Sequence, residues 1–414
     1  MYHWHRDTAQ IMMWLIHITI LFAISWLYQR KIHLDVSPII YWCGLAAKLS
    51  AGICLGFIFS SYYAYGDTFD FFHEAKRIAD LPFREYIDLQ LSLSDYTTTE
   101  HPRVLVFSKI LSVFVLLTGG SYWISSLYFS LASFFASWYL IAQVSRFYPG
   151  IRHLSIVCFL FIPSIVFWSS GIIKDALAFT SLSLMVAIFL KWHHTQKLSL
   201  WHLLLGIASL LILLRIKHYL LITFLIFLGL ALFYRFWKRQ SGMKWAAVPV
   251  LLLMLFFTQM VHPYLNLSRI PLTLYENNEA IREKTSDKNQ LNIIIDAPDW
   301  LSVIREVPES IKTGLLRPSI FDPTPHWGWF HRVENLVLTF LIFLSILLII
   351  KEKPALEYGL IIPACMAIII LATFLALSTP NFGTLVRYKN AFMPYLFLIA
   401  AILPYRYYTS KGME

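Results

Sequence analysis

Residues 333–350 read VENLVLTFLIFLSILLII, and residues 357–377 read EYGLIIPACMAIIILATFLAL. Each segment is continuously apolar over a length close to the roughly 17–25 residues that a helix needs to cross a bilayer. The apolar residues do not alternate with polar ones and the runs are too long for barrel strands, which argues against a membrane β-barrel. Both segments therefore predict membrane-spanning helices.

The composition of the whole chain agrees with this prediction. Of 414 residues, 58% are hydrophobic and 14% are charged, and the mean hydropathy is +0.61. Soluble proteins carry about 25% charged residues, so this chain has too little polar surface for a water-soluble particle. The net charge of +10 is spread in ones and twos between apolar runs, which argues against nucleic acid as a partner.

The same length criterion predicts an all-α polytopic bundle of eleven spans, in contact with membrane lipids. The predicted spans are 11–28, 37–60, 122–145, 154–168, 173–190, 199–214, 219–234, 246–261, 333–350, 357–377 and 390–404. A further apolar run, 104–118, is short and ends at Gly119-Gly120.

Basic residues in short loops predict which side is cytoplasmic. The residues that mark this side are Arg30, Lys31, Arg146, Arg152, Lys191, Lys197, Arg235, Lys238, Arg239, Lys244, Lys351, Lys353, Arg406 and Lys411. The long loops 61–103 and 262–332 then lie outside, with 17 of the 24 acidic residues. This topology requires that 104–118 does not cross the membrane, so that 61–121 forms one external element.

The chain is accordingly divided into five parts. They are an N-terminal span and turn (1–36), a core (37–234), a cytoplasmic loop and span (235–261), an external loop (262–332) and the C-terminal spans (333–414).

Carboxylates at the ends of the first external loop are candidates for catalysis. Asp67 and Asp70 follow a span directly, and Glu100 and His101 close the loop. A carboxylate just above the bilayer can deprotonate a hydroxyl group or coordinate a cation. The alternative for Asp67 is that it only caps the helix that begins near Thr68.

Basic residues at the external ends of spans are candidates for binding phosphate. Arg215, Lys217 and His218 meet at the junction of two short spans, although Lys and Arg also snorkel to the interface for purely structural reasons. Lys174, beside Asp175, binds substrate or closes the start of a helix with an ion pair.

The second external loop and the spans add further candidates. Arg317, Asp322 and Trp327 lie in or near proline-bounded turns, although Trp327 also suits an aromatic interface belt. Glu334 lies in the first turn of a span and requires a partner, either Arg332 or a nearby base, or a substrate. Arg387 lies before the last span, where it either binds phosphate or only anchors the topology. Lys48 lies within a span, which is costly for a charge, and is expected to face other helices.

The order of these motifs resembles the membrane-embedded GT-C glycosyltransferases, a superfamily that includes protein O-mannosyltransferases and lipid A aminoarabinose transferases. Gly66-Asp67 matches the first acidic motif, and Glu100-His101-Pro102 resembles the second, with Arg103 in place of a second proline. Lys217 matches a basic residue between paired short spans. The resemblance covers about residues 37–234, and the span 11–28 is additional.

The resemblance implies transfer of a sugar from a polyprenyl-phosphate or polyprenyl-diphosphate carrier to a hydroxyl of a lipid, glycan or protein acceptor. The reaction would take place on the periplasmic face of a bacterial inner membrane. Asp67 would act as the general base with support from Glu100. The donor phosphate would be held by Arg215, Lys217, His218 and Arg387, and other substrate contacts would come from Asp70, His101, Lys174, Arg317, Trp327 and Glu334.

No metal site or other cofactor is predicted, because no HxxxH or HExxH motif occurs, although a divalent cation stays open as a cofactor. Two alternatives remain. A lipid-linked glycan polymerase or ligase shares the many spans and the large external loop, but does not require the early acidic loop. A flippase or transporter would place charged residues through several spans, whereas here only Lys48 lies deep.

Overall fold

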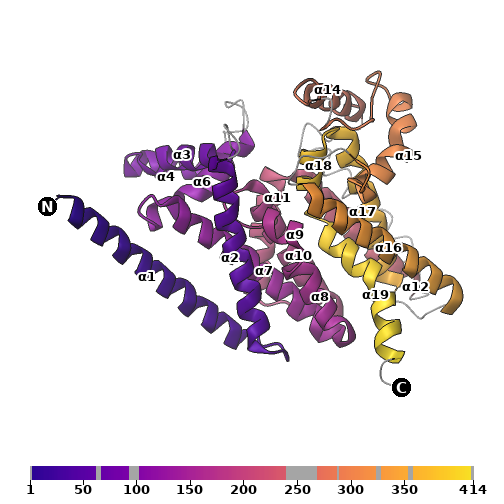
Figure 1. Ribbon diagram of the computed structural model, residues 1–414, viewed down its shortest axis with the longest axis horizontal. Helices are drawn as coiled ribbons and strands as arrows, with labels where there is room; N and C mark the ends of the chain where they lie inside the picture. The colour runs from indigo at the N-terminus through magenta and orange to yellow at the C-terminus, as the bar shows by residue number, and fades with distance from the viewer. Residues whose placement is uncertain are drawn as a thin grey trace. The chain divides into compact units, whose positions relative to one another are not determined.

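The computed structural model describes residues 2–61, 67–92, 102–238, 268–286, 289–322, 328–352 and 358–411. Within these ranges the secondary structure is helical, and the only strand-like pairing is an isolated bridge between Gln290 and Asn381. The predicted all-α class is confirmed. The chain divides into two compact units, Met1–Lys217 and His218–Glu414 (Figure 1).

Seven of the described helices are long and apolar enough to cross a membrane, so the chain is a multi-pass membrane protein. These helices are Gln10–Lys31, Pro38–Ser61, Tyr122–Phe147, Lys174–Thr195, His218–Arg235, Trp329–Glu352 and Tyr358–Ser378. Each of them contains or largely overlaps one predicted span.

The four remaining predicted spans differ. Span 199–214 folds as α11 (Leu200–Ile216), a shorter apolar helix of 17 residues, and span 390–404 falls mostly within α19 (Met393–Lys411). Span 246–261 lies outside the described residues. The prediction of one helix over 154–168 is wrong, because α8 (Arg152–Leu160) ends before α9 (Pro163–Trp168) begins. Pro163 lacks a backbone N–H and favours an extended residue before it, and Ile162 is extended, with ψ 119°.

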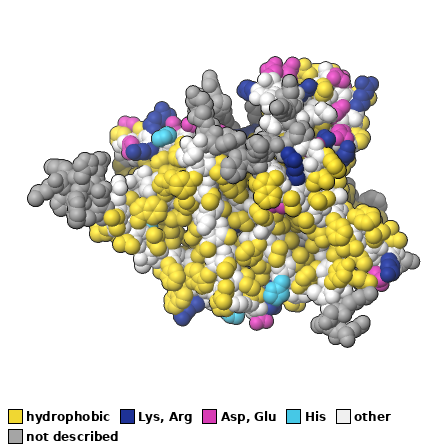
Figure 2. Space-filling model, in the orientation of Figure 1, with side chains coloured by type: hydrophobic (Ala, Val, Ile, Leu, Met, Phe, Trp, Pro, Cys, Tyr) yellow, Lys and Arg dark blue, Asp and Glu magenta, His cyan; other side chains and the backbone are white. Residues whose placement is uncertain are grey.

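The molecular surface is rich in hydrophobic side chains, which cover much of the visible face in Figure 2. Large apolar residues on the candidate spans stay exposed, among them Phe22, Phe57 and Phe340. Exposure of such an extensive apolar surface to water would be unfavourable, whereas in a membrane it contacts lipid tails, which are also apolar.

In unit 1, α7 (Tyr122–Phe147) packs against both α2 (Pro38–Ser61) and α10 (Lys174–Thr195). Short polar side chains let these helices approach closely. The buried serines Ser126, Ser130, Ser133 and Ser137 recur at intervals of three or four residues along one face of α7. Unit 1 also contains α1 (Tyr2–Lys31), the 3₁₀ turn η1 (Pro149–Ile151) and α11.

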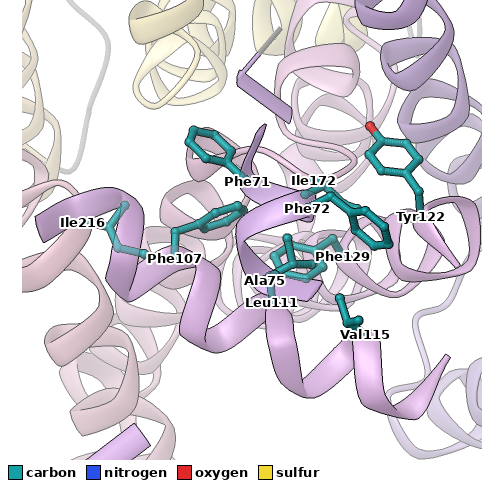
Figure 3. Packing of buried hydrophobic residues seen from close by; sticks show 10 residues of the cluster. All are labelled: Phe71, Phe72, Ala75, Phe107, Leu111, Val115, Tyr122, Phe129, Ile172 and Ile216. Carbon is teal, nitrogen blue, oxygen red and sulfur yellow. The ribbon is translucent and has the colours of Figure 1, made fainter. Parts of the chain in front are cut away.

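The predicted external element 61–121 contains α3 (Asp67–Ala79), α4 (Phe83–Leu91) and α6 (Pro102–Leu117). Helices α3 and α6 lie side by side and share a hydrophobic core with α7 (Figure 3). The labelled residues of this core are Phe71, Phe72, Ala75, Phe107, Leu111, Val115, Tyr122, Phe129, Ile172 and Ile216. After α6, Gly119 and Gly120 adopt positive φ angles of 59° and 77°, which favours glycine, and Ser121 then caps α7.

Unit 2 is arranged around α17 (Tyr358–Ser378), against which α12 (His218–Lys238), α14 (Ile270–Glu283) and α15 (Trp300–Leu316) pack. Helix α16 (Trp329–Glu352) packs against α19, and α18 (Phe382–Lys389) follows α17. Gly314 permits the close approach of α15 to α17, because a Cβ atom there would lie 2.2 Å from the carbonyl oxygen of Ala372.

Candidate functional site

The helical path of unit 1 is interrupted between α9 and α10, at Ser169–Ile173. This non-helical segment is buried throughout. In a bundle of membrane helices, non-helical backbone is tolerated only where the protein or a cavity satisfies its polar groups. Membrane transport proteins often bind their ligands at interrupted helices. The residues around this segment are therefore candidates for a functional site.

Side chains of α7 satisfy part of the polar backbone here. The backbone N–H of Gly171 donates to Ser130 Oγ over 2.9 Å, and Ser126 Oγ donates to the carbonyl of Gly52 over 3.1 Å. Gly171 has a φ of 75°, and a Cβ atom on it would lie 3.2 Å from the Cα of Gly52. Glycine at both positions therefore brings α2 and the segment into backbone contact.

Helix α3 is tied to the same segment at its first turn. The hydroxyl of Thr68 donates to the carbonyl of Ile172 over 2.7 Å, and lies 2.8 Å from the hydroxyl of Tyr122. A hydroxyl group has one proton, so Tyr122 donates to Thr68. Asp67 is the preceding residue, the first of α3, and its side chain is exposed. The predicted catalytic acid is thus held beside the segment that leads into α10.

The end of this segment that leads into α10 also lies beside a buried ion pair. Asp175, in the first turn of α10, accepts a hydrogen bond from the ammonium of Lys217, which follows α11. Only 8% of the Lys217 side chain and 5% of the Asp175 side chain are exposed. Lys217 is therefore buried and paired, which overturns the alternative that it snorkels to the interface. Neighbouring Lys174 places its ammonium 4.6 Å from the ring centroid of Phe71 on α3.

A second buried cation, Lys48, lies at the other end of the same segment. Its ammonium donates to Ser133 Oγ over 3.1 Å and to Ser169 Oγ, and lies 4.7 Å from the ring centroid of Phe179. The expectation that Lys48 faces other helices is confirmed. Among the residues that the structure describes, its polar partners are hydroxyl groups and no carboxylate pairs with it.

Three other predicted site residues differ in how far they are buried. Asp70 is exposed on α3, Arg215 is partly buried near the end of α11, and His218 is buried at the start of α12. Glu100 and His101 lie outside the described residues, and so does Trp327.

In unit 2, the predicted residues lie on or beside α15, α16 and α18. The guanidinium of Arg317 lies 3.1 Å from Asp322 and 3.5 Å from Glu309, so the expected proline-bounded turn is held by ion pairs. His331 Nδ1 lies 3.8 Å from a carboxylate oxygen of Glu334, three residues further along α16. Arg387 is partly buried on α18.

The same region contains a cation that the sequence did not reveal. The buried ammonium of Lys389 donates to the carbonyls of Leu315 and Arg317, over 3.0 Å and 2.7 Å, at the C-terminal end of α15. Such placement complements the negative end of the helix dipole. Burial lowers the pKa of Lys389 to about 7, and the carboxylate of Glu334 partly opposes this shift.

One feature of the site has a signal in the local sequence, and another has none. The serine face of α7 was not predicted, although Ser126, Ser130, Ser133 and Ser137 follow helical spacing in the sequence. The partner of Asp175 was not visible, because Lys217 lies 42 residues away. Within the described part of the chain, no group of three or more His, Cys, Asp or Glu residues is arranged to hold a metal ion.

Comparison with known proteins gives no match: no family model, no curated protein and no solved structure shows significant similarity to the chain.

Proposed function

We propose that this membrane protein is a glycosyltransferase of the GT-C type. It moves a sugar from a polyprenyl-phosphate or polyprenyl-diphosphate carrier to a hydroxyl of a lipid, glycan or protein acceptor. The observation that carries the proposal is the hydrogen bond from Thr68 to Ile172, which holds Asp67 beside the segment leading to Lys174 and Asp175. A carboxylate and several cations are thereby gathered at one end of α10.

The reaction needs both kinds of group. The acceptor oxygen attacks the anomeric carbon, the bond from that carbon to the carrier phosphate oxygen breaks, and Asp67 takes the hydroxyl proton. Negative charge develops on the departing phosphate, where cations stabilise it. The proposed phosphate contacts are Arg215, Lys217, His218 and Arg387. Glu100 is the second acid of the proposal.

The remaining proposed substrate contacts come from both external loops and the helix ends beside them. They are Asp70, His101, Lys174, Arg317, Trp327 and Glu334. In this proposal the site lies on the periplasmic face of a bacterial inner membrane. The element order supports it: the first acid opens α3 shortly after the span α2, and α4 and α6 follow before the next span, α7.

A lipid-linked glycan polymerase or ligase is the alternative enzyme, and the nature of the acceptor separates it from the transferase. A flippase is the weaker alternative. Lys48, the deep cation that a transport path would use, is fully buried between serine hydroxyls and the ring of Phe179.

The test is sugar transfer by the purified, reconstituted protein from a panel of polyprenyl-phosphate-linked sugars. Asp67→Asn is expected to lower the transfer rate by roughly 10²–10⁴-fold, the usual contribution of general base catalysis. Glu74→Gln on the same helix is the matched control, because it removes only an ion pair with the exposed Arg77. Full activity of Asp67→Asn would show that Asp67 is not the general base. If the wild type moved the lipid-linked sugar across the membrane without transferring the sugar, the proposal that the protein is an enzyme would be wrong.

A further inference from the structure

We propose that α7, α10 and α11 form a binding site for the phosphate headgroup of an anionic phospholipid. The site is built from Arg146 on α7, Lys191 on α10 and His202 on α11. None of these residues takes part in the proposed sugar transfer, so the lipid site and the transferase can be tested independently of each other.

Contacts between polar side chains bring the three helices together here. The ammonium of Lys191 and the hydroxyl of Tyr139 on α7 each lie 2.9 Å from Nε2 of His202. On the other side of the ring, Nδ1 of His202 contacts the hydroxyl of Ser199, the residue that caps α11. Lys191, Tyr139 and His202 are all partly buried, which holds their positions but leaves part of each side chain accessible.

The cluster contains more hydrogen-bond donors than acceptors. An unprotonated ring nitrogen of histidine has one lone pair, so Nε2 of His202 accepts a full hydrogen bond from Lys191 or from Tyr139, but not from both. A protonated Nε2 accepts from neither. The ammonium of Lys191 has three donors and no acceptor. The cluster therefore suits a ligand that brings acceptors, and the oxygens of a phosphate are strong acceptors for charged donors.

The cluster also has positive charge without a balancing carboxylate. Arg146 lies close enough to Lys191 to repel its charge. Within the ranges that the structure describes, no carboxylate forms an ion pair with Arg146 or Lys191. Each cation complements the dipole of its own helix, but their mutual repulsion remains. An anion bound between them would relieve this repulsion, so the local field attracts a negatively charged ligand.

The surroundings of the cluster favour a lipid over a free anion. The first turn of α11, which contains His202, also exposes large apolar side chains: Leu200 is 70% exposed, Trp201 74% and Leu203 49%. Tryptophan is enriched where lipid headgroups meet the hydrocarbon core of a membrane. A phospholipid can place its phosphate against the cluster and its acyl chains along this apolar surface. A free phosphate would use only the first of these contacts.

The experiment measures lipid binding by the full-length protein in a neutral detergent. The protein is titrated with phosphatidylglycerol, with phosphatidylcholine, whose headgroup has a phosphate but no net charge, and with inorganic phosphate. Native mass spectrometry counts the retained lipid, and the rise in melting temperature is recorded for the same samples. The variants are Arg146→Gln and Lys191→Gln, with Lys31→Gln at the exposed end of α1 as the matched control.

The wild type is expected to bind phosphatidylglycerol in preference to phosphatidylcholine and to be stabilised by it. Arg146→Gln and Lys191→Gln should each weaken the binding of phosphatidylglycerol by about fivefold, the usual contribution of one cation near a membrane surface. Lys31→Gln should leave this binding unchanged. A variant that is less stable without lipid stays informative, because the measured quantity is the rise in melting temperature that the lipid causes.

Three outcomes would overturn the proposal. Equal binding of the two phospholipids by the wild type would show that the site does not select an anionic headgroup. Stabilisation by inorganic phosphate equal to that by phosphatidylglycerol would assign the cluster to a free anion and not to a lipid. An equal loss of binding in Lys31→Gln would show general attraction to surface charge, without a site at His202.

Discussion

The hydroxyl of Thr68 donates a 2.7 Å hydrogen bond to the backbone carbonyl of Ile172, 104 residues further along the chain. This bond joins the first turn of α3 to the buried segment before α10. It thereby connects the exposed carboxylate of Asp67 with the end of unit 1 that carries the Asp175–Lys217 pair. Substitutions around this segment, and of one buried cation in unit 2, are expected to change the stability of the protein.

Thr68→Val should destabilise unit 1 by about 1–3 kcal/mol, because the isosteric side chain leaves the Ile172 carbonyl without its donor. Thermal unfolding of the detergent-solubilised protein measures the change. Tyr122→Phe is the control, since it removes the Tyr122–Thr68 bond and retains the Thr68–Ile172 bond. A Thr68→Val variant as stable as the wild type would show that the anchor is dispensable.

Lys48→Met should unfold within about 1 kcal/mol of the wild type or be more stable, because a flexible apolar side chain replaces a buried amine that has only hydroxyl partners. Lys48→Glu should instead lose about 3–5 kcal/mol, since it buries a carboxylate without a cation. Melting temperatures of both variants provide the comparison. Severe destabilisation by methionine would mean that the amine itself holds α2, α7 and Ser169 together.

Gly52→Ala should destabilise the protein by about 1–3 kcal/mol, because the new Cβ would lie 2.2 Å from Ser130 Oγ and 3.1 Å from the backbone nitrogen of Gly171. Gly206→Ala on α11 is the matched control. Its nearest neighbour would be Ile188 Cδ1 at 3.8 Å, an ordinary contact, so a gain of up to about 1 kcal/mol is expected from helix propensity. Equal stability of the two variants would contradict the close packing around Gly171.

The stability of unit 2 should rise with pH between about 7 and 10, because of Lys389. Burial lowers its folded-state pKa to about 7, below the ordinary value of 10.5. Within that interval the unfolded chain binds the proton and the folded chain does not, so raising the pH favours folding; below pH 7 both states are protonated and this contribution is constant.

Comparing melting temperatures of the wild type and Lys389→Met across this pH range isolates the effect. The variant should be less stable, because the carbonyls of Leu315 and Arg317 lose their donor, and should lack the rise with pH. The same pH slope in both proteins would assign the effect to another group.

The sequence by itself determined that this chain crosses a membrane several times. Long apolar runs such as 333–350 leave few alternatives, because a lipid-embedded backbone must form its own hydrogen bonds within each segment. The sequence also placed Asp67 at a helix start, directly after a span. The break at Pro163 was not predicted, because the apolar run around it indicated one span.

Tertiary structure alone decided how the buried polar groups are paired. Lys217 pairs with Asp175, Lys48 with two serines, and Lys389 with the carbonyls of α15. The physical reason is that a helix that is apolar on all sides does not specify which face turns inward. Partners far apart in the sequence come into contact only when each helix has a fixed rotation about its own axis. That rotation depends on close contacts such as the one between Gly52 and Gly171.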